Sequence, residues 1–112
     1  MRINDINLTA HFNLREFECG CCQRVKLSPT LVMRLEELRW LWGRPLVVTS
    51  GYRCETHNKA VGGVENSRHT QGTAADIRVP ESEQGNFYAL AKRCGFTRII
   101  RYESRNFVHL EE

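Results

Sequence analysis

The sequence predicts a small single-domain α+β protein whose helices pack on one face of a mostly antiparallel sheet. A chain of 112 residues is long enough for one domain with a modest core, so residues 1–112 are treated as one unit. Apolar residues recur with helical spacing in residues 29–42, whereas apolar and polar residues alternate near the C-terminus. The first pattern predicts an amphipathic helix and the second predicts strands.

The first half of the chain predicts one short turn and one long helix. Asn13 can cap a helical turn over residues 14–17. Ser28 is a suitable N-cap and Pro29 a suitable first residue for the long helix, which Gly43 ends. The apolar stripe of this helix consists of Leu31, Leu35, Leu38 and Trp42, and Trp40 lies off the stripe.

The second half predicts strands, a helix and one long loop. Residues 54–72 are glycine-rich and long for a loop in so small a domain, and loops of this length are often functional. Gly95 would stop the second helix, in which Cys94 faces the core. The predicted elements are strands over residues 46–49 and 74–79, a helix over residues 82–94, and an antiparallel pair, 97–102 and 107–110, around a turn at 103–106.

Two histidines and one aspartate form a candidate metal site. His69 and Asp76 are seven residues apart, and His109 follows near the C-terminus. Two imidazoles and one carboxylate are a ligand set that leaves a zinc ion one open position, whereas closed structural sites normally use four protein ligands. The alternative is that these are a loop histidine, a turn-capping aspartate and a strand histidine.

The residues around this trio favour the metal site. Gly72, Ala74 and Ala75 are small, so the backbone between the first two ligands can fold tightly. We expect Asp76 at the start of a strand with His69 on the preceding loop, and His109 on another strand. Neighbouring strands would bring the distant ligands together.

Five cysteines leave a second question open. The odd number does not suggest a framework of disulfides. Cys19, Cys21 and Cys22 could form part of a second metal site with Cys54 as a distant partner, although no paired Cys-x-x-Cys motif is present. The alternative is that they are reduced thiols, some of them packed as small hydrophobic side chains.

Composition argues against several classes of protein. The net charge of +3 is small, and no basic run interleaved with aromatic residues points to nucleic acid. No apolar run approaches the roughly 20 residues that span a bilayer, so we expect no membrane contact. The polar N-terminus shows no hydrophobic signal segment, and we therefore expect synthesis in the cytoplasm without a signal peptide.

Four motifs follow one another along the chain: Ser-Gly-Tyr-Arg at residues 50–53, a His-Asn-Lys-Ala-Val-Gly-Gly segment at 57–63, the block 69–76, and Phe-Val-His at 107–109. In this order they resemble the zinc D-Ala-D-Ala carboxypeptidase family, whose peptidoglycan-cleaving members share their fold with the signalling domain of hedgehog proteins. The segment 8–17 also looks like the start of such domains, so the resemblance covers nearly the whole chain.

The resemblance implies one zinc ion held by His69, Asp76 and His109. It also implies that Arg53 anchors a substrate carboxylate, a task suited to a planar guanidinium that forms two parallel hydrogen bonds. Ser67, two residues before the first histidine, is expected to bind substrate or to orient a ligand.

The catalytic base is where the sequence departs from the family. Many members carry an acidic residue three positions before the last ligand, but this position is Asn106, which cannot titrate. We therefore predict Glu103 as the base, because residues 102–105 are similar to a stretch of hedgehog domains that places a glutamate beside the metal. Glu111 and Glu112 are the fallbacks, and Glu111 could instead hydrogen-bond a ligand. The alternative for Glu103 is a solvated glutamate in a turn.

These features together predict a monomeric zinc metallopeptidase that hydrolyses peptidoglycan stem peptides, as a carboxypeptidase or an endopeptidase. A small domain of this kind resembles lysis enzymes of phages or prophages, which would act on the bacterial cell wall. The alternative from another class is a catalytically inactive, zinc-containing cell-wall-binding module. A weaker third alternative is a zinc or redox protein centred on its cysteines.

Overall fold

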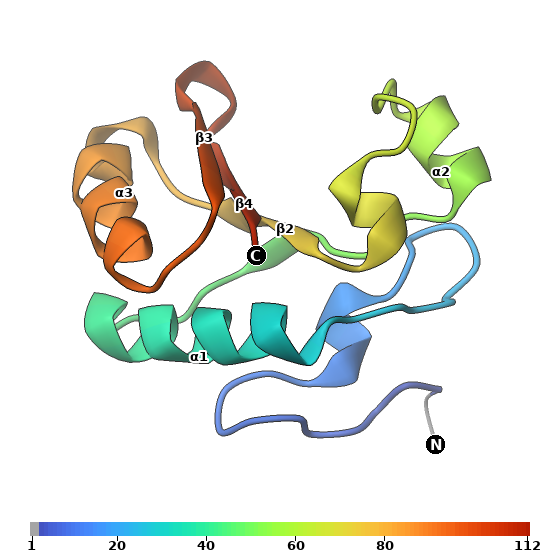
Figure 1. Cartoon of the computed structure of the whole chain (residues 1–112), viewed down its shortest axis with the longest axis horizontal. Helices are drawn as coiled ribbons and strands as arrows, with labels where there is room; N and C mark the ends of the chain where they lie inside the picture. Colours follow the sequence, from blue (N-terminus) through green and yellow to red (C-terminus); the bar gives the residue numbers. More distant parts are fainter. Residues whose placement is uncertain (1–2) are drawn as a thin grey trace.

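The computed structural model describes residues 3–112 as an α+β domain, which confirms the predicted fold class (Figure 1). Four antiparallel strands form one sheet in the order β1-β2-β4-β3. No described helix is long and apolar enough to cross a membrane. The strands are β1 (Val48–Ser50), β2 (Ala74–Arg78), β3 (Arg98–Tyr102) and β4 (Phe107–Glu111), and the helices are α1 (Pro29–Trp42), α2 (Glu55–Ala60) and α3 (Gln84–Arg93).

The two faces of the sheet have different environments. Ile77 of β2 and Leu110 of β4 are fully buried in the core cluster, together with residues of α1 and α3. Because side chains alternate along a strand, the intervening residues point to the opposite face. That face carries Asp76 and His109, which line a cavity. Helices α1 and α3 thus cover one face, and the other face carries the cavity, to whose lining α2 contributes His57.

Helix α1 forms largely as its sequence predicts. Pro29 starts the helix and Gly43 ends it in a left-handed conformation with φ of 73°. The expected cap differs, because the hydroxyl of Ser28 contacts Glu112 and makes no hydrogen bond to the helix. The predicted stripe faces the core: Leu31, Leu35 and Leu38 are fully buried, and Trp42 packs edge-on against Phe87, while Trp40 is 66% exposed.

The remaining elements match the predicted segments with shifted bounds. The predicted strand at 46–49 is shorter and later, as β1 begins at Val48. The turn at residues 14–17 is the 3₁₀ helix η1 (Leu14–Phe17), in which Asn13 and Glu16 form a reciprocal capping box. The predicted helix at 82–94 is α3 preceded by the 3₁₀ helix η3 (Glu81–Glu83), and Cys94 is buried as expected.

The segment 54–72 is not an unstructured loop. It contains α2 and a second 3₁₀ helix, η2 (Arg68–Gln71), so His69 lies on a helical turn and not on a plain loop. Gly63, between these two elements, has no room for a side chain. A Cβ there would lie 2.1 Å from Oδ1 of Asn58, so glycine is needed for the backbone of residue 63 to lie this close to the Asn58 side chain.

We predict that Leu35→Ala destabilises the domain by about 2–5 kcal/mol, because it leaves a cavity beneath the sheet. Leu35 is fully buried, whereas Met33 on the same helix is 67% exposed. Met33→Ala is therefore the matched control, with an expected change within about 0.5 kcal/mol. Urea unfolding followed by far-UV circular dichroism measures both, and equal effects would contradict the assigned orientation of α1.

Candidate metal centre and active site

The three predicted ligands converge on the open face of the sheet. His69, Asp76 and His109 each present one ligand atom, and these atoms all lie within 4.8 Å of one another. Nε2 of His69 lies 3.3 Å from Oδ1 of Asp76, and Nδ1 of His109 lies 2.8 Å from the same oxygen. All three residues are buried.

The sheet register explains how Asp76 and His109 meet. Asp76 lies in the middle of β2, not at its start as expected, and is paired directly with His109 of β4. Ser50 of β1 is the partner of Asp76 on its other side. Since directly opposed residues share one face of an antiparallel sheet, the carboxylate and the imidazole both face the cavity.

His69 reaches the site from η2. Its backbone N–H donates to the hydroxyl of Ser67, the N-cap of this 3₁₀ helix, at 3.2 Å. Its Nδ1 lies 2.8 Å from the carbonyl oxygen of Gly51. Because a carbonyl can only accept, Nδ1 carries a proton, which leaves Nε2 as the atom that faces Asp76 and, in the neutral ring, as the atom that can bind a metal. This is the tautomer that a metal ligand requires.

His109 lies between two carboxylates. Its Nδ1 faces Asp76, and its Nε2 lies 2.9 Å from Oε2 of Glu111. Burial acts to lower the pKa of His109, but the hydrogen bonds with both carboxylates outweigh it and raise this pKa above its usual value. With Nδ1 directed at a metal, the Nε2–H group would donate to Glu111 and fix the ring orientation.

Asp76 is held as a carboxylate by its neighbours. Burial acts to raise its pKa, but hydrogen bonds with His109 and His69 outweigh burial and lower the pKa to about 2. Nη2 of Arg53 lies 3.3 Å from its second oxygen. An ionised carboxylate between two imidazoles is a suitable donor set for a divalent cation such as zinc.

Arg53 is brought to the site and positioned by three partners. Besides Asp76, its Nε donates to the hydroxyl of Ser50 at 2.9 Å and its Nη1 to Oδ1 of Asn58 at 3.2 Å. Asn58 is itself buried and donates to the carbonyl of Val64. These bonds use three of the five N–H groups of the guanidinium, which leaves two for another ligand.

The cavity over this centre has a volume of about 650 Å³. Its only carboxylates among the described residues are Asp76 and Glu111. Glu103, the predicted base, does not line it. This residue lies on the 3₁₀ helix η4 (Glu103–Arg105), where its side chain is 54% exposed and pairs with Arg101 at 3.6 Å.

Sequence reasoning missed the basic lining of the cavity. Arg68, Arg98 and Arg105 face it together with Arg53. Alternation along β3 could have revealed one of them, because Arg98, Ile100 and Tyr102 all fall on the cavity face. Nothing in the sequence spacing relates Arg68 or Arg105 to this site.

Comparison with known proteins agrees with this arrangement. A model of the Peptidase M15 family matches residues 7–111, so the chain belongs to this family, and the expected zinc metallopeptidase class is confirmed at the level of the family. The chain is also similar to a zinc D-Ala-D-Ala carboxypeptidase from Streptomyces albus G, with 42% identity over 71 residues. The match covers 60% of this chain and 27% of the relative, so the chain spans only about a quarter of the relative's length.

We predict that zinc stabilises the protein more strongly as the pH rises from 5 to 8. The depressed pKa of Asp76 contributes stability above about pH 4 that is lost as the pH falls toward 2. The raised pKa of His109 contributes stability to the metal-free protein that is present below about pH 6.5 and is lost as the pH rises through its folded value. Zinc binds only the neutral ring of His109, so it competes with the proton on that ring, and this competition weakens as the pH rises.

The measurement is the melting temperature of zinc-loaded and chelator-treated protein at each pH. The difference between the two should grow with pH, and His69→Ala should reduce it throughout the range. A difference that is independent of pH would contradict binding through His109.

Proposed function

We propose that this protein is a zinc-dependent peptidase that hydrolyses peptidoglycan stem peptides. The observation that carries the proposal is the convergence of His69, Asp76 and His109 at the floor of an arginine-lined cavity, with one further carboxylate beside them. Membership of the Peptidase M15 family supports the reaction class. The name of the Streptomyces relative supports a substrate that ends in D-Ala-D-Ala.

The donor set fits one zinc ion with a free coordination position. His69 would bind through Nε2, His109 through Nδ1 and Asp76 through Oδ1, since these atoms already face one another. Zinc held in this way supplies a Lewis acid that polarises a carbonyl and acidifies a bound water. The carbonyl of Gly51 and the carboxylate of Glu111 hold the two rings in the orientation that binding needs.

Glu111 is the proton-transfer group that we propose in place of Glu103. Amide hydrolysis needs a base that accepts a proton from the attacking water and returns one to the leaving amine. Asp76 is committed to the metal, which leaves Glu111 as the free carboxylate of the cavity. Its Oε2 is held at His109, and its side chain is only 14% exposed.

The basic lining supports a substrate with a carboxylate terminus. Arg53 keeps two N–H groups free and is held rigidly, so it can receive a carboxylate with little loss of side-chain entropy. Ser67 is engaged by the backbone of His69, which favours a role in positioning this ligand, although it also lines the cavity. A free terminal carboxylate on Arg53 corresponds to a carboxypeptidase, and an internal one corresponds to an endopeptidase.

We further propose a setting in cell-wall lysis. A compact domain with a wall-directed peptidase site suits a phage or prophage enzyme that is made in the cytoplasm and acts as a monomer on the bacterial wall. The support is the chemistry of the site.

The test is incubation of zinc-loaded protein with defined muropeptides, with and without a chelator, followed by mass spectrometry of the products. We expect chelator-sensitive loss of the terminal D-Ala from pentapeptide stems, or scission within the stem or cross-link. Tight binding to cell walls without release from any substrate would instead support the inactive binding module.

We predict that Glu111→Gln lowers kcat by about 10²–10⁴-fold while zinc content stays near one equivalent at this site. Glu103→Gln is the matched control on an exposed glutamate and should change kcat less than about threefold. The kcat and the zinc content of each variant show which of the two glutamates transfers the proton. If Glu103→Gln abolished turnover and Glu111→Gln did not, Glu103 would be the base. Loss of zinc in Glu111→Gln would show that this residue acts mainly by orienting His109.

A further inference from the structure

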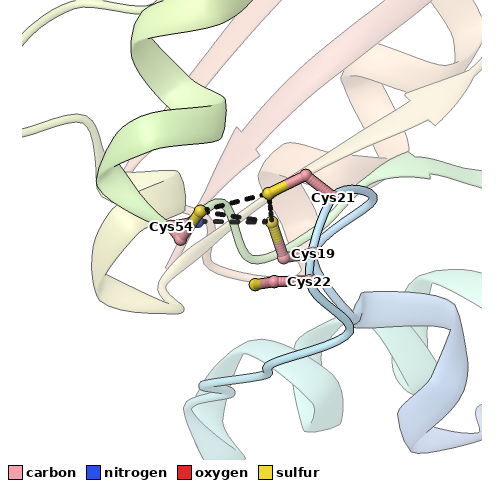
Figure 2. A group of neighbouring side chains, drawn as sticks. All are labelled: Cys19, Cys21, Cys22 and Cys54. Carbon is pink, nitrogen blue, oxygen red and sulfur yellow. Dashed lines mark hydrogen bonds between the residues drawn. The ribbon is translucent and has the colours of Figure 1, made fainter.

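Four cysteines that are distant in sequence converge on the far side of the Arg53 loop. Cys19, Cys21 and Cys22 lie on the loop after η1, and Cys54 is the N-cap of α2. Figure 2 shows the sulfurs of Cys19, Cys21 and Cys54 directed at one another from these two segments. Ligand atoms of all four residues lie within 4.8 Å of one another. The zinc peptidase site uses none of them.

The sulfur spacing is that of a metal thiolate cluster. The Sγ atoms of Cys21 and Cys54 are 3.4 Å apart, those of Cys19 and Cys21 are 3.6 Å apart, and those of Cys19 and Cys54 are 3.7 Å apart. A tetrahedral zinc ion with Zn–S bonds of about 2.3 Å requires neighbouring sulfurs to be about 3.8 Å apart. Three sulfurs therefore already form one face of such a tetrahedron, and Cys22 is near enough to complete it.

The backbone around the cluster favours thiolates. The N–H of Cys54 donates to Sγ of Cys19 at 3.5 Å, and the N–H of His57 donates to Sγ of Cys54 at 3.4 Å. Hydrogen bonds to the charged form of a group favour that form, and thiolate sulfur is the species that binds zinc. The first of these bonds joins the two segments, and the second also caps the N-terminus of α2.

We propose that Cys19, Cys21, Cys22 and Cys54 hold a second, structural zinc ion. With four thiolates the site is closed, in contrast to the three-ligand site in the cavity, so it leaves no position for substrate. Each thiol gives up its proton when the ion binds. The spacing of three nearly equidistant sulfurs suits a shared ion better than a disulfide, which joins two sulfurs at about 2.05 Å and leaves the others unpaired.

The proposed ion would fasten the N-terminal segment to the loop that carries Arg53. Cys54 follows Arg53 directly, and the N–H of Tyr52 donates to the carbonyl of Phe17 at 2.8 Å. A Cβ on Gly51 would lie 2.7 Å from Cα of Phe17, so the two segments are in close contact on this side as well. The zinc would thus fix one end of the stretch 51–54, and the contacts with Phe17 hold the other end, so the guanidinium of Arg53 lies on a segment anchored on both sides.

Metal content by mass spectrometry tests the proposal on the full chain purified under reducing conditions. We expect two zinc equivalents in the wild type and one in His69→Ala. Cys21→Ser and Cys54→Ser should each lose one equivalent and keep the zinc of the cavity. Cys94→Ala is the matched control, because this buried cysteine lies outside the cluster, and it should retain both.

Cobalt substitution identifies the ligands by their absorption, and its first measurement needs no cysteine variant. His69→Ala loaded with Co²⁺ should show the near-UV charge-transfer absorption of thiolate ligands, since its remaining site is made of sulfur. Cys22→Ser should weaken this absorption and His57→Ala should not, although the His57 ring lies near Gly20. A single zinc equivalent in the wild type would overturn the proposal. So would fewer than five titratable thiols in the denatured, chelator-treated protein, which would indicate a disulfide instead.

Discussion

The antiparallel register of β2 and β4 sets Asp76 directly opposite His109, and the cavity is organised around this pair. The register is enforced from the other face of the sheet, where Ile77 and Leu110 are fully buried against the helices. A slip of one residue would move Asp76 into the core and bring Ile77 to the cavity. The burial of apolar side chains by α1 and α3 therefore determines where the polar site can form.

Burying a carboxylate is costly unless partners compensate for its charge, and the residues around Asp76 supply them. Two imidazoles and the guanidinium of Arg53 share its oxygens. Arg53 in turn depends on Asn58, whose close approach is possible only because residue 63 is glycine. The segment that contains the Ser-Gly-Tyr-Arg and Gly-Gly motifs thus holds the guanidinium of Arg53 beside the candidate metal site, although a metal ion bound there would repel it.

Sequence reasoning found the fold class and the three converging side chains because each leaves a local signal. The helical spacing of Leu31, Leu35 and Leu38 and the alternation in residues 107–110 report directly on burial. The position of Asp76 within its strand could not be read in this way, since the short apolar run after it suggested a strand beginning there. The sequence suggested that Cys19, Cys21 and Cys22 could form a site with Cys54, but only the coordinates show that the four residues meet. The links from Arg53 to Asn58 and Asp76 left no signal in the sequence.

The two candidate bases, Glu103 and Glu111, differ in what the sequence could predict about them. Glu103 was favoured by similarity of a short stretch, but on η4 its side chain is 54% exposed and does not line the cavity, although Tyr102 and Arg105 on either side do. Glu111 lies two residues after His109 on one strand, and the period of a strand places both on the cavity face. Three cations then surround Glu111: His109 at 2.9 Å if protonated, Arg98 at 3.9 Å and Arg68 at 4.0 Å.

This crowding of cations has a consequence for binding. The chain carries a net charge of only +3, yet among residues 3–112 four arginines line the cavity against two carboxylates. A divalent ion on the two histidines and Asp76 would add further positive charge. A cleft in which cations outnumber carboxylates raises the local concentration of anionic ligands, and it favours those that bring a carboxylate to the guanidinium of Arg53. A stem peptide with a free terminus, the substrate class proposed above, meets this requirement, whereas an uncharged internal segment does not. If the proposed function holds, the electrostatics would therefore favour cleavage near a carboxylate.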